Sequence, residues 1–221
     1  MIRKSLLCAS LAGAAVAIAV GVAPSESYAN TVSFTLTSDH CDGGCGPQAG
    51  GFGSIVVTDA AGGGVDLTLT LINGNKLINT GLGGDYSFAF DLTGNPTVTY
   101  SAFVGFAAVQ NPQSAQNFNF DGVGNFDYGL KCDLCGNGGG GGLPGPFSVH
   151  ISDITTASFA QNANGQFFGV DIISGTTGLT GAVDASVAVQ VPFAPVGAGL
   201  PGFIAACGGL VALARRRRKT S

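Results

Sequence analysis

The fold of this chain is decided by the stretch Gly53-Ser-Ile-Val-Val-Thr-Asp-Ala-Ala-Gly-Gly-Gly-Val-Asp-Leu-Thr-Leu-Thr-Leu71. Over residues 65–71, Val and Leu alternate strictly with Asp and Thr, which gives a strand one apolar face and one polar face. Residues 53–58 are rich in β-branched side chains, and three glycines at 62–64 join the two segments as a tight loop. The stretch therefore predicts an antiparallel hairpin with one buried face.

Short strand patterns of the same kind recur through the chain, separated by Gly, Asn, Pro and Asp. They cover residues 31–37, 85–91, 97–101, 125–130, 147–152, 167–173 and 183–189. Tyr86, Phe88 and Phe90 alternate and are expected to share one face. Helix signals are nearly absent, apart from a short helix or 3₁₀ turn that could form within 152–161. We predict an all-β fold, an antiparallel β-sandwich of jelly-roll-like type.

The N-terminal residues have the pattern of a secretory signal peptide. Arg3 and Lys4 are followed by an apolar run over residues 6–22, and Ser27-Tyr28-Ala29 offers small residues where a signal peptidase cuts. We predict a signal peptide over residues 1–29, removed by signal peptidase before Asn30. The alternative is an anchor that is never cleaved.

The C-terminal residues have the pattern of a membrane segment followed by a cytoplasmic basic tail. Residues 196–214 are apolar and about long enough for a helix to cross the hydrocarbon core. Five cations follow at once, namely Arg215, Arg216, Arg217, Arg218 and Lys219. Because such cations stay in the cytoplasm, this helix predicts that the residues before it lie outside the inner membrane.

This layout resembles the PEP-CTERM class of exosortase-sorted bacterial surface proteins. The resemblance is carried by Val191-Pro192-Phe193-Ala194-Pro195, the apolar segment and the basic tail, with Val-Pro-Phe-Ala-Pro in the place of the usual Pro-Glu-Pro. It implies that an exosortase-type enzyme cuts near Pro192 to Pro195. It also implies a place at the cell surface or in the extracellular matrix, in association with exopolysaccharide or biofilm. The alternative is an ordinary anchor that is never cut.

The body also resembles a recurring set of PEP-CTERM proteins of unassigned function. The similar stretches are residues 38–47, 70–75, 121–128 and 171–178. No activity comes with this resemblance, so it bears only on location and architecture.

Between these ends, residues 30–191 form the predicted exported domain, and 192–221 the sorting signal. The exported domain holds two lysines and twelve aspartates, a formal charge of −10. Phosphate contacts need Lys and Arg, so this charge argues against binding to nucleic acid or anionic lipid. An acidic body suits a soluble extracellular protein and leaves carboxylates free for calcium.

Four cysteines in the exported domain form two close pairs, Cys41 with Cys45 and Cys132 with Cys135. An even number of cysteines in an exported domain points to disulfides. We favour pairing within each loop, while crossed pairing would instead close a loop of roughly 90 residues. Four thiolates, or three with His40, could alternatively bind zinc. A redox-active motif at Cys132 is less favoured, because a polyglycine run follows it.

Few residues of the domain suit catalysis or calcium binding. His150 alternates with Val149 and Ile151, which places it on the solvent face of a strand, and no G-x-S-x-G motif is present. We therefore expect no enzyme activity and no cofactor. Asp121, Asn125 and Asp127 are weak calcium candidates, because they lack the order of an EF-hand loop. The alternative is a hairpin turn whose amides these side chains satisfy.

Together these patterns predict a non-catalytic surface or matrix protein with a structural or adhesive role. The alternative is a jelly-roll carbohydrate-binding module, with calcium as an optional ligand. Sugar sites normally stack on exposed aromatic rings, and the chain has no Trp and four Tyr. That composition favours the first prediction.

Overall fold

The computed structural model describes residues 29–80, 86–120, 122–135 and 141–190. These residues are all-β, with a single turn of 3₁₀ helix at Thr156–Ser158 inside the segment where such a turn was predicted. Among them, no helix is long and apolar enough to cross a membrane. Except for Ala29, the predicted signal peptide and the sorting signal over 192–221 lie outside the described residues.

Sheet A contains six antiparallel strands in the order β16-β1-β3-β4-β12-β7. Their bounds are β1 (Thr31–Leu36), β3 (Gly53–Asp59), β4 (Val65–Leu71), β7 (Tyr100–Val104), β12 (Phe147–Ile151) and β16 (Ala188–Gln190). The hairpin predicted over 53–71 is confirmed as β3 and β4, which pair from Gly53 with Leu71 to Asp59 with Val65.

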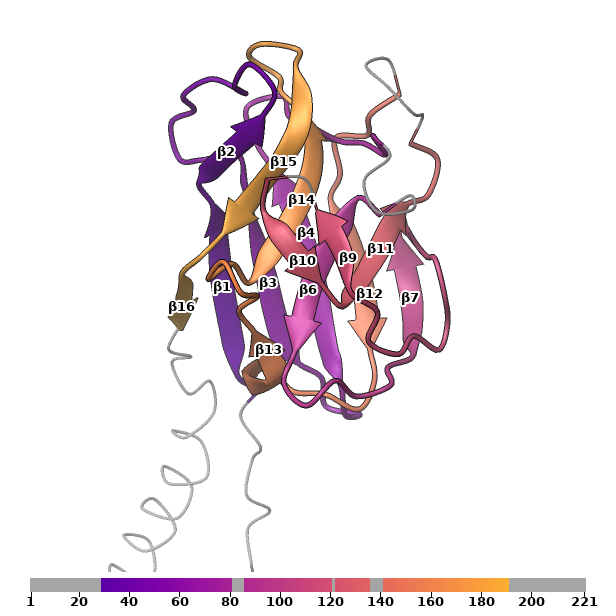
Figure 1. The fold of residues 1–221 in the computed structure, drawn as a ribbon. Helices are drawn as coiled ribbons and strands as arrows, with labels where there is room; N and C mark the ends of the chain where they lie inside the picture. Colours follow the sequence, from indigo (N-terminus) through magenta and orange to yellow (C-terminus); the bar gives the residue numbers. More distant parts are fainter. Residues whose placement is uncertain (1–28, 81–85, 121, 136–140, 191–221) are drawn as a thin grey trace, which may run out of the picture.

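Sheet B packs against sheet A in a sandwich-like arrangement, with the order β2-β15-β14-β6-β11-β8 (Figure 1). Its strands are β2 (Ser38–Cys41), β6 (Phe88–Leu92), β8 (Phe106–Ala108), β11 (Tyr128–Cys132), β14 (Phe168–Ile173) and β15 (Thr180–Ala185). Two short strands, β5 (Lys76–Leu77) and β13 (Phe159–Ala160), pair with β14 and β6. A separate hairpin joins β9 (Phe118–Phe120) to β10 (Gly124–Phe126).

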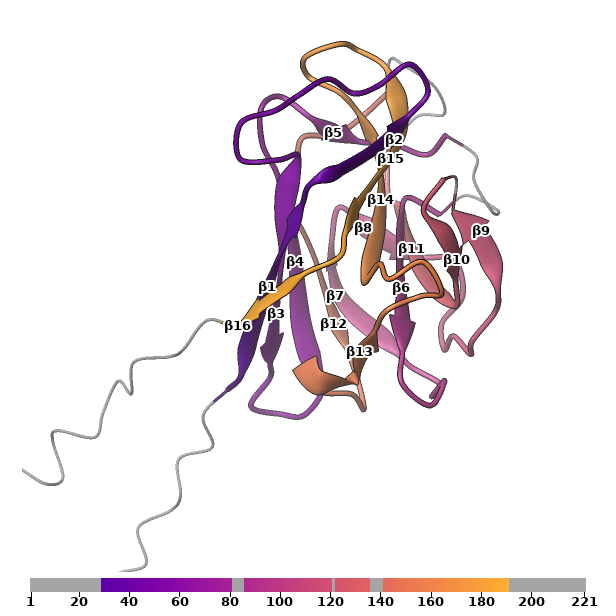
Figure 2. The ribbon, with the colours of Figure 1, turned by 60° about the vertical axis from the view of Figure 1, so that its left-hand side comes forward.

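The strand pairs are nested like the two arms of one long hairpin. β1 pairs with β16, β2 with β15, β6 with β14, β7 with β12, β8 with β11 and β9 with β10. As a consequence, the first strand lies beside the last, with Val32 opposite Gln190. Both ends of the described body therefore leave the same end of the sandwich (Figures 1 and 2).

The core between the sheets is built from the apolar faces that the alternating patterns predicted. Phe34 of sheet A meets Phe168 of sheet B edge-on, with their ring centroids 4.7 Å apart. Phe88 and Phe90 of the neighbouring strand β6 pack on the same Phe168 ring. All four side chains are fully buried, so truncating any one would cost about 3–5 kcal/mol.

The hairpin β9–β10 covers the outer face of sheet B (Figure 2). Its aromatic side chains lie over small residues of the sheet, because a Cβ on Gly169 would come within 2.8 Å of the Phe120 ring. A Cβ on Gly129 would likewise come within 3.0 Å of Phe118. Glycine at these strand positions thus allows close approach of the covering layer.

Four strand predictions are wrong in detail. Residues 125–130 divide at Asp127 between β10 and β11, and residues 183–189 divide between β15 in sheet B and β16 in sheet A. β7 begins only at Tyr100. Tyr86 also does not share a face with Phe88 and Phe90, because β6 begins at Phe88 and the Tyr86 ring stacks instead on Phe118 of the covering hairpin.

Candidate functional site

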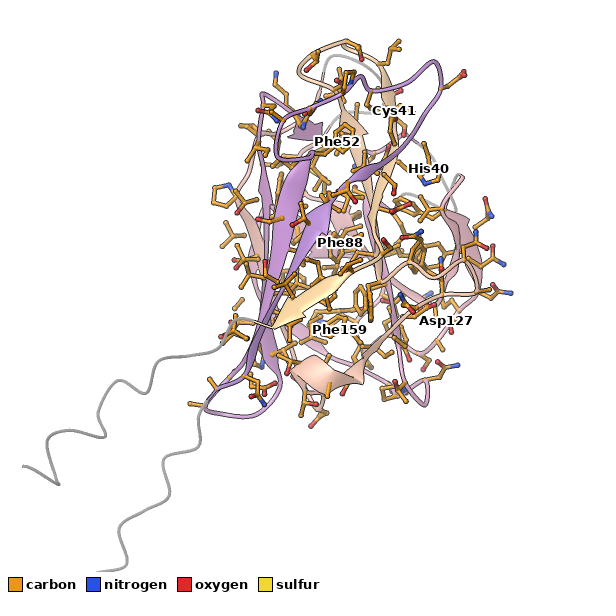
Figure 3. The ribbon with its side chains drawn as sticks, turned by 90° about the vertical axis from the view of Figure 1, so that its left-hand side faces the viewer. His40, Cys41, Phe52, Phe88, Asp127 and Phe159 are labelled. Atoms are coloured by element: carbon orange, nitrogen blue, oxygen red, sulfur yellow. A yellow bond between two sulfur atoms is a disulfide. The ribbon has the colours of Figure 1, made fainter. Side chains whose placement is uncertain are left out.

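Two disulfides join Cys41 to Cys45 and Cys132 to Cys135, with Cα–Cα separations of 5.3 and 5.4 Å. Pairing within each loop is thereby confirmed over the crossed arrangement. β2 and β11 run in the same direction, since each is separated from β14 by one antiparallel neighbour. Both bridges therefore lie at one end of the sandwich, here called the disulfide pole (residues 41–52, 72–77, 132–135 and 174–179), and the chain ends lie at the other (Figure 3).

The first disulfide loop is organised by the carboxylate of Asp39. Its Oδ1 accepts a hydrogen bond from the Cys41 N–H at 2.9 Å, and its Oδ2 accepts one from the Cys45 N–H at 2.7 Å. Asp39 also lines a hollow of about 390 Å³, together with Thr37, Gln48 and Phe52. Because both oxygens already hold backbone donors, this carboxylate serves first to fix the loop.

A buried amide connects this loop to its neighbours. Asn75 is 1% exposed and exchanges two hydrogen bonds with the Gln48 side chain, at 2.6 and 3.0 Å. It also donates to the Phe52 carbonyl and accepts from the Gly175 N–H. Three loops of the disulfide pole are therefore tied through one side chain, which no local sequence pattern indicated.

The second disulfide loop is held by Asn79, which is also buried. Its amide nitrogen donates to the carbonyls of Cys132 and Cys135, and its oxygen accepts from the Cys132 N–H. The Ser87 hydroxyl hydrogen-bonds both Asn79 and the Cys132 backbone. Sequence reasoning missed this support, because a single Asn and Ser far from the cysteines carry no signal.

The zinc alternative finds no support in this geometry. Among the described residues, the one group with metal-ligand spacing is Asp39, Cys41 and Cys45, and its two sulfurs are bonded to each other. His40 Nε2 instead lies 2.6 Å from Asp184 Oδ2, within hydrogen-bonding distance. Disulfide sulfurs are not the thiolates that zinc requires.

The three calcium candidates are not assembled into a site by the described residues. Asp121 lies outside them. Asn125 Oδ1 accepts from Asn119 across the β9–β10 hairpin at 3.0 Å, and Asp127 Oδ1 accepts from the Asn117 N–H at 3.2 Å. The loop therefore forms a hairpin turn, with Asn125 bonded across the strands rather than to turn amides.

Both histidines are paired with aspartates. His150 lies on the outer face of sheet A, as predicted, with Nδ1 2.8 Å from Asp66. His40 Nε2 contacts Asp184, which is fully buried. Within the described part of the chain, neither imidazole hydrogen-bonds a Ser, Thr or Cys side chain, so no charge-relay arrangement forms around it there.

One carboxyl has a strongly altered affinity for protons. Burial raises the pKa of the Asp91 carboxyl from 3.8 to about 6. The N–H of Asp127 donates to Oδ1 at 2.6 Å and lowers that pKa, while the charge of Asp127 raises it again. Tyr128 is beside this pair, and burial together with both carboxylates raises its pKa to about 12.

Comparison of the chain with protein-family models, curated proteins and solved structures found no match.

Proposed function

We propose that this protein is an exported, C-terminally sorted bacterial surface or extracellular-matrix protein with a non-catalytic structural or adhesive role. The observation that carries the proposal is the pair of disulfides at the pole opposite the chain ends. Structural disulfides persist in oxidising compartments outside the cytoplasm. They fit the export implied by the signal-peptide pattern at residues 1–29.

The arrangement of the ends supports the sorting part of the proposal. β1 and β16 are neighbours at the edge of sheet A, so the described body begins and ends at one end of the sandwich. A body held by its C-terminal segment would present the disulfide pole away from the membrane. Signal peptidase and an exosortase-type enzyme are the proposed processing partners, with cleavage near Asn30 and near Pro192 to Pro195.

The nested strand pairing supports the finer proposal of a jelly-roll-like sandwich, because a long antiparallel hairpin wound into two sheets generates that fold. This topology also favours the second candidate function, a carbohydrate-binding module. The hydrogen bonds of Asn125 and Asp127 within the protein do not favour calcium assistance. A glycan array probed with and without a chelator distinguishes these two candidates.

A deletion strain tests the surface role. Loss of the gene is expected to alter matrix cohesion, adhesion or aggregation and to leave hydrolytic activities in the culture unchanged. The full chain should restore the phenotype, whereas a chain ending at residue 191 should be exported but fail to be retained at the surface. A strain without any adhesion or matrix defect, or a purified body that cleaves a polysaccharide, would contradict the proposal.

A further inference from the structure

The two outer faces of the sandwich differ. The outer face of sheet B is covered by the β9–β10 hairpin, whereas no described element covers the outer face of sheet A (Figures 2 and 3). The burial pattern alternates along β1, β3, β4 and β12, so their less buried residues point outward together. Six of these are Ser or Thr whose side chains make no hydrogen bond to any described residue, namely Ser33, Thr35, Ser54, Thr68, Thr70 and Ser148. We call these six residues the hydroxyl face.

The hydroxyl face is arranged in rows across neighbouring strands. One row runs from Ser33 through Val56 and Thr68 to Ser148. The next row runs from Thr35 through Ser54 to Thr70. Neighbouring strands lie about 5 Å apart, and successive outward residues of one strand about 7 Å apart. The face therefore offers closely spaced hydroxyls that can each donate one hydrogen bond and accept up to two.

This face is almost without charge, although the body carries a formal −10. The one carboxylate among the outward residues of these four strands is Asp66, and it pairs with His150 at 2.8 Å. Serine and threonine are common at exposed positions, and here they leave two rows of unpaired hydroxyls with no charge among the outward residues other than Asp66, which pairs with His150.

We infer that the hydroxyl face binds an uncharged, flexible polysaccharide chain. Hydroxyl-rich sugars supply the donors and acceptors that unpaired Ser and Thr side chains can meet, and a neutral chain suffers no repulsion from the acidic body. The twist of the sheet, roughly 20–25° per strand, prevents a match to a flat crystalline surface over several strands. Because no aromatic ring occupies these rows, each contact is weak and binding depends on many contacts along the polymer.

Other occupants fit this face less well. An anionic polysaccharide or a nucleic acid would be repelled by the body and would meet no cation among the outward residues of β1, β3, β4 and β12. Two copies of the exported domain would each bring a formal −10 to a face-to-face contact. The inference depends on the proposed surface role only for the location at which the protein meets the polymer, because binding by the hydroxyl face can be tested on purified protein.

Affinity electrophoresis of the purified body, in gels containing dextran, laminarin or hydroxyethylcellulose, tests the inference. At least one of these neutral polymers should retard the protein, and alginate, a polyanion, should not. A double variant, Thr68→Val with Thr70→Val, removes two hydroxyls and keeps β-branched side chains, so it should stay folded and bind on the order of tenfold more weakly. A matched control, Thr93→Val with Thr176→Val, alters exposed threonines outside the face and should bind as the parent does.

The inference would be overturned if none of the three neutral polymers retarded the protein, or if alginate alone did. It would also be overturned if the two double variants were retarded to the same extent. So would sedimentation showing a dimer that the Thr68→Val and Thr70→Val changes dissociate. Unchanged thermal unfolding of both double variants verifies that any loss of binding is local. If the processed protein is present at the cell surface and no neutral polymer binds, the proposed function survives and this inference alone fails.

Discussion

Gly169→Ala tests whether the β9–β10 hairpin packs directly on sheet B. A Cβ at this position would lie 2.8 Å from Phe120 Cδ1 and 3.1 Å from the Phe126 ring. Carbon atoms in contact prefer about 3.5–4.0 Å, and Phe120 is fully buried, so the hairpin must shift. Overpacking of this kind costs about 1–3 kcal/mol, and replacing a strand glycine by alanine returns about 0.5–1 kcal/mol. We expect a net loss of about 1–2 kcal/mol in the free energy of unfolding.

A double-mutant cycle with Phe120→Ala isolates this contact. Removing the Phe120 ring takes away the 2.8 Å contact and leaves only the one with Phe126, so Gly169→Ala should cost clearly less in the Phe120→Ala background. Gly62→Ala is the matched control, because no atom lies within 4 Å of its Cβ position. The chain contains no Trp, so urea unfolding would be followed by circular dichroism. An equal cost of Gly169→Ala with and without the Phe120 ring would refute the packing argument.

Three further predictions concern charge, backbone strain and the disulfides. The folded-state pKa of Asp91 is about 6, above its value of 3.8 in the unfolded chain, so its contribution to stability is present below pH 4 and is lost as the pH rises through 6. Asp91→Asn should therefore stabilise the protein by about 1–2 kcal/mol at pH 7.5 after allowance for solvent screening, and by little at pH 4, as measured by urea unfolding at the two pH values. Leu134 is 85% exposed, and its φ of 84° lies in the left-handed region, where leucine is strained and asparagine is tolerated. Leu134→Asn should therefore raise the free energy of unfolding by about 1 kcal/mol, and a lower free energy of unfolding would contradict the presence of backbone strain at this position. Reduction of the two disulfides should lower the free energy of unfolding by about 2 kcal/mol for each short loop and leave the sheets folded at 25 °C. Loss of the β-sheet circular dichroism signal on reduction would instead show that the bridges are needed to keep the core folded.

The local features of the fold could be predicted from the sequence because their causes are local. Alternation over 65–71 and the adjacent glycines define a hairpin by themselves, and the three- and four-residue spacings of the cysteines favour bridges within each loop. The outward position of His150 follows from its apolar neighbours in the same way.

What the sequence did not predict depends on contacts between distant residues. Strand β10 ends at Phe126, and the N–H of the next residue, Asp127, bonds to Asp91, 36 residues away. The partner of His40 illustrates the same point, since the contact of His40 with Asp184 spans 144 residues. The crossing between the sheets after Ala185 also has no local signal, because Val183 and Val189 continue the same alternation.

Intact-mass analysis of the protein released from the cell surface tests the central claim most directly. The account predicts one major species that begins near Asn30, ends between Pro192 and Pro195, and is lighter than its reduced form by the four hydrogen atoms that two disulfides lose. A major species that retains Arg215 to Lys219, or a chain with four free thiols, would contradict it.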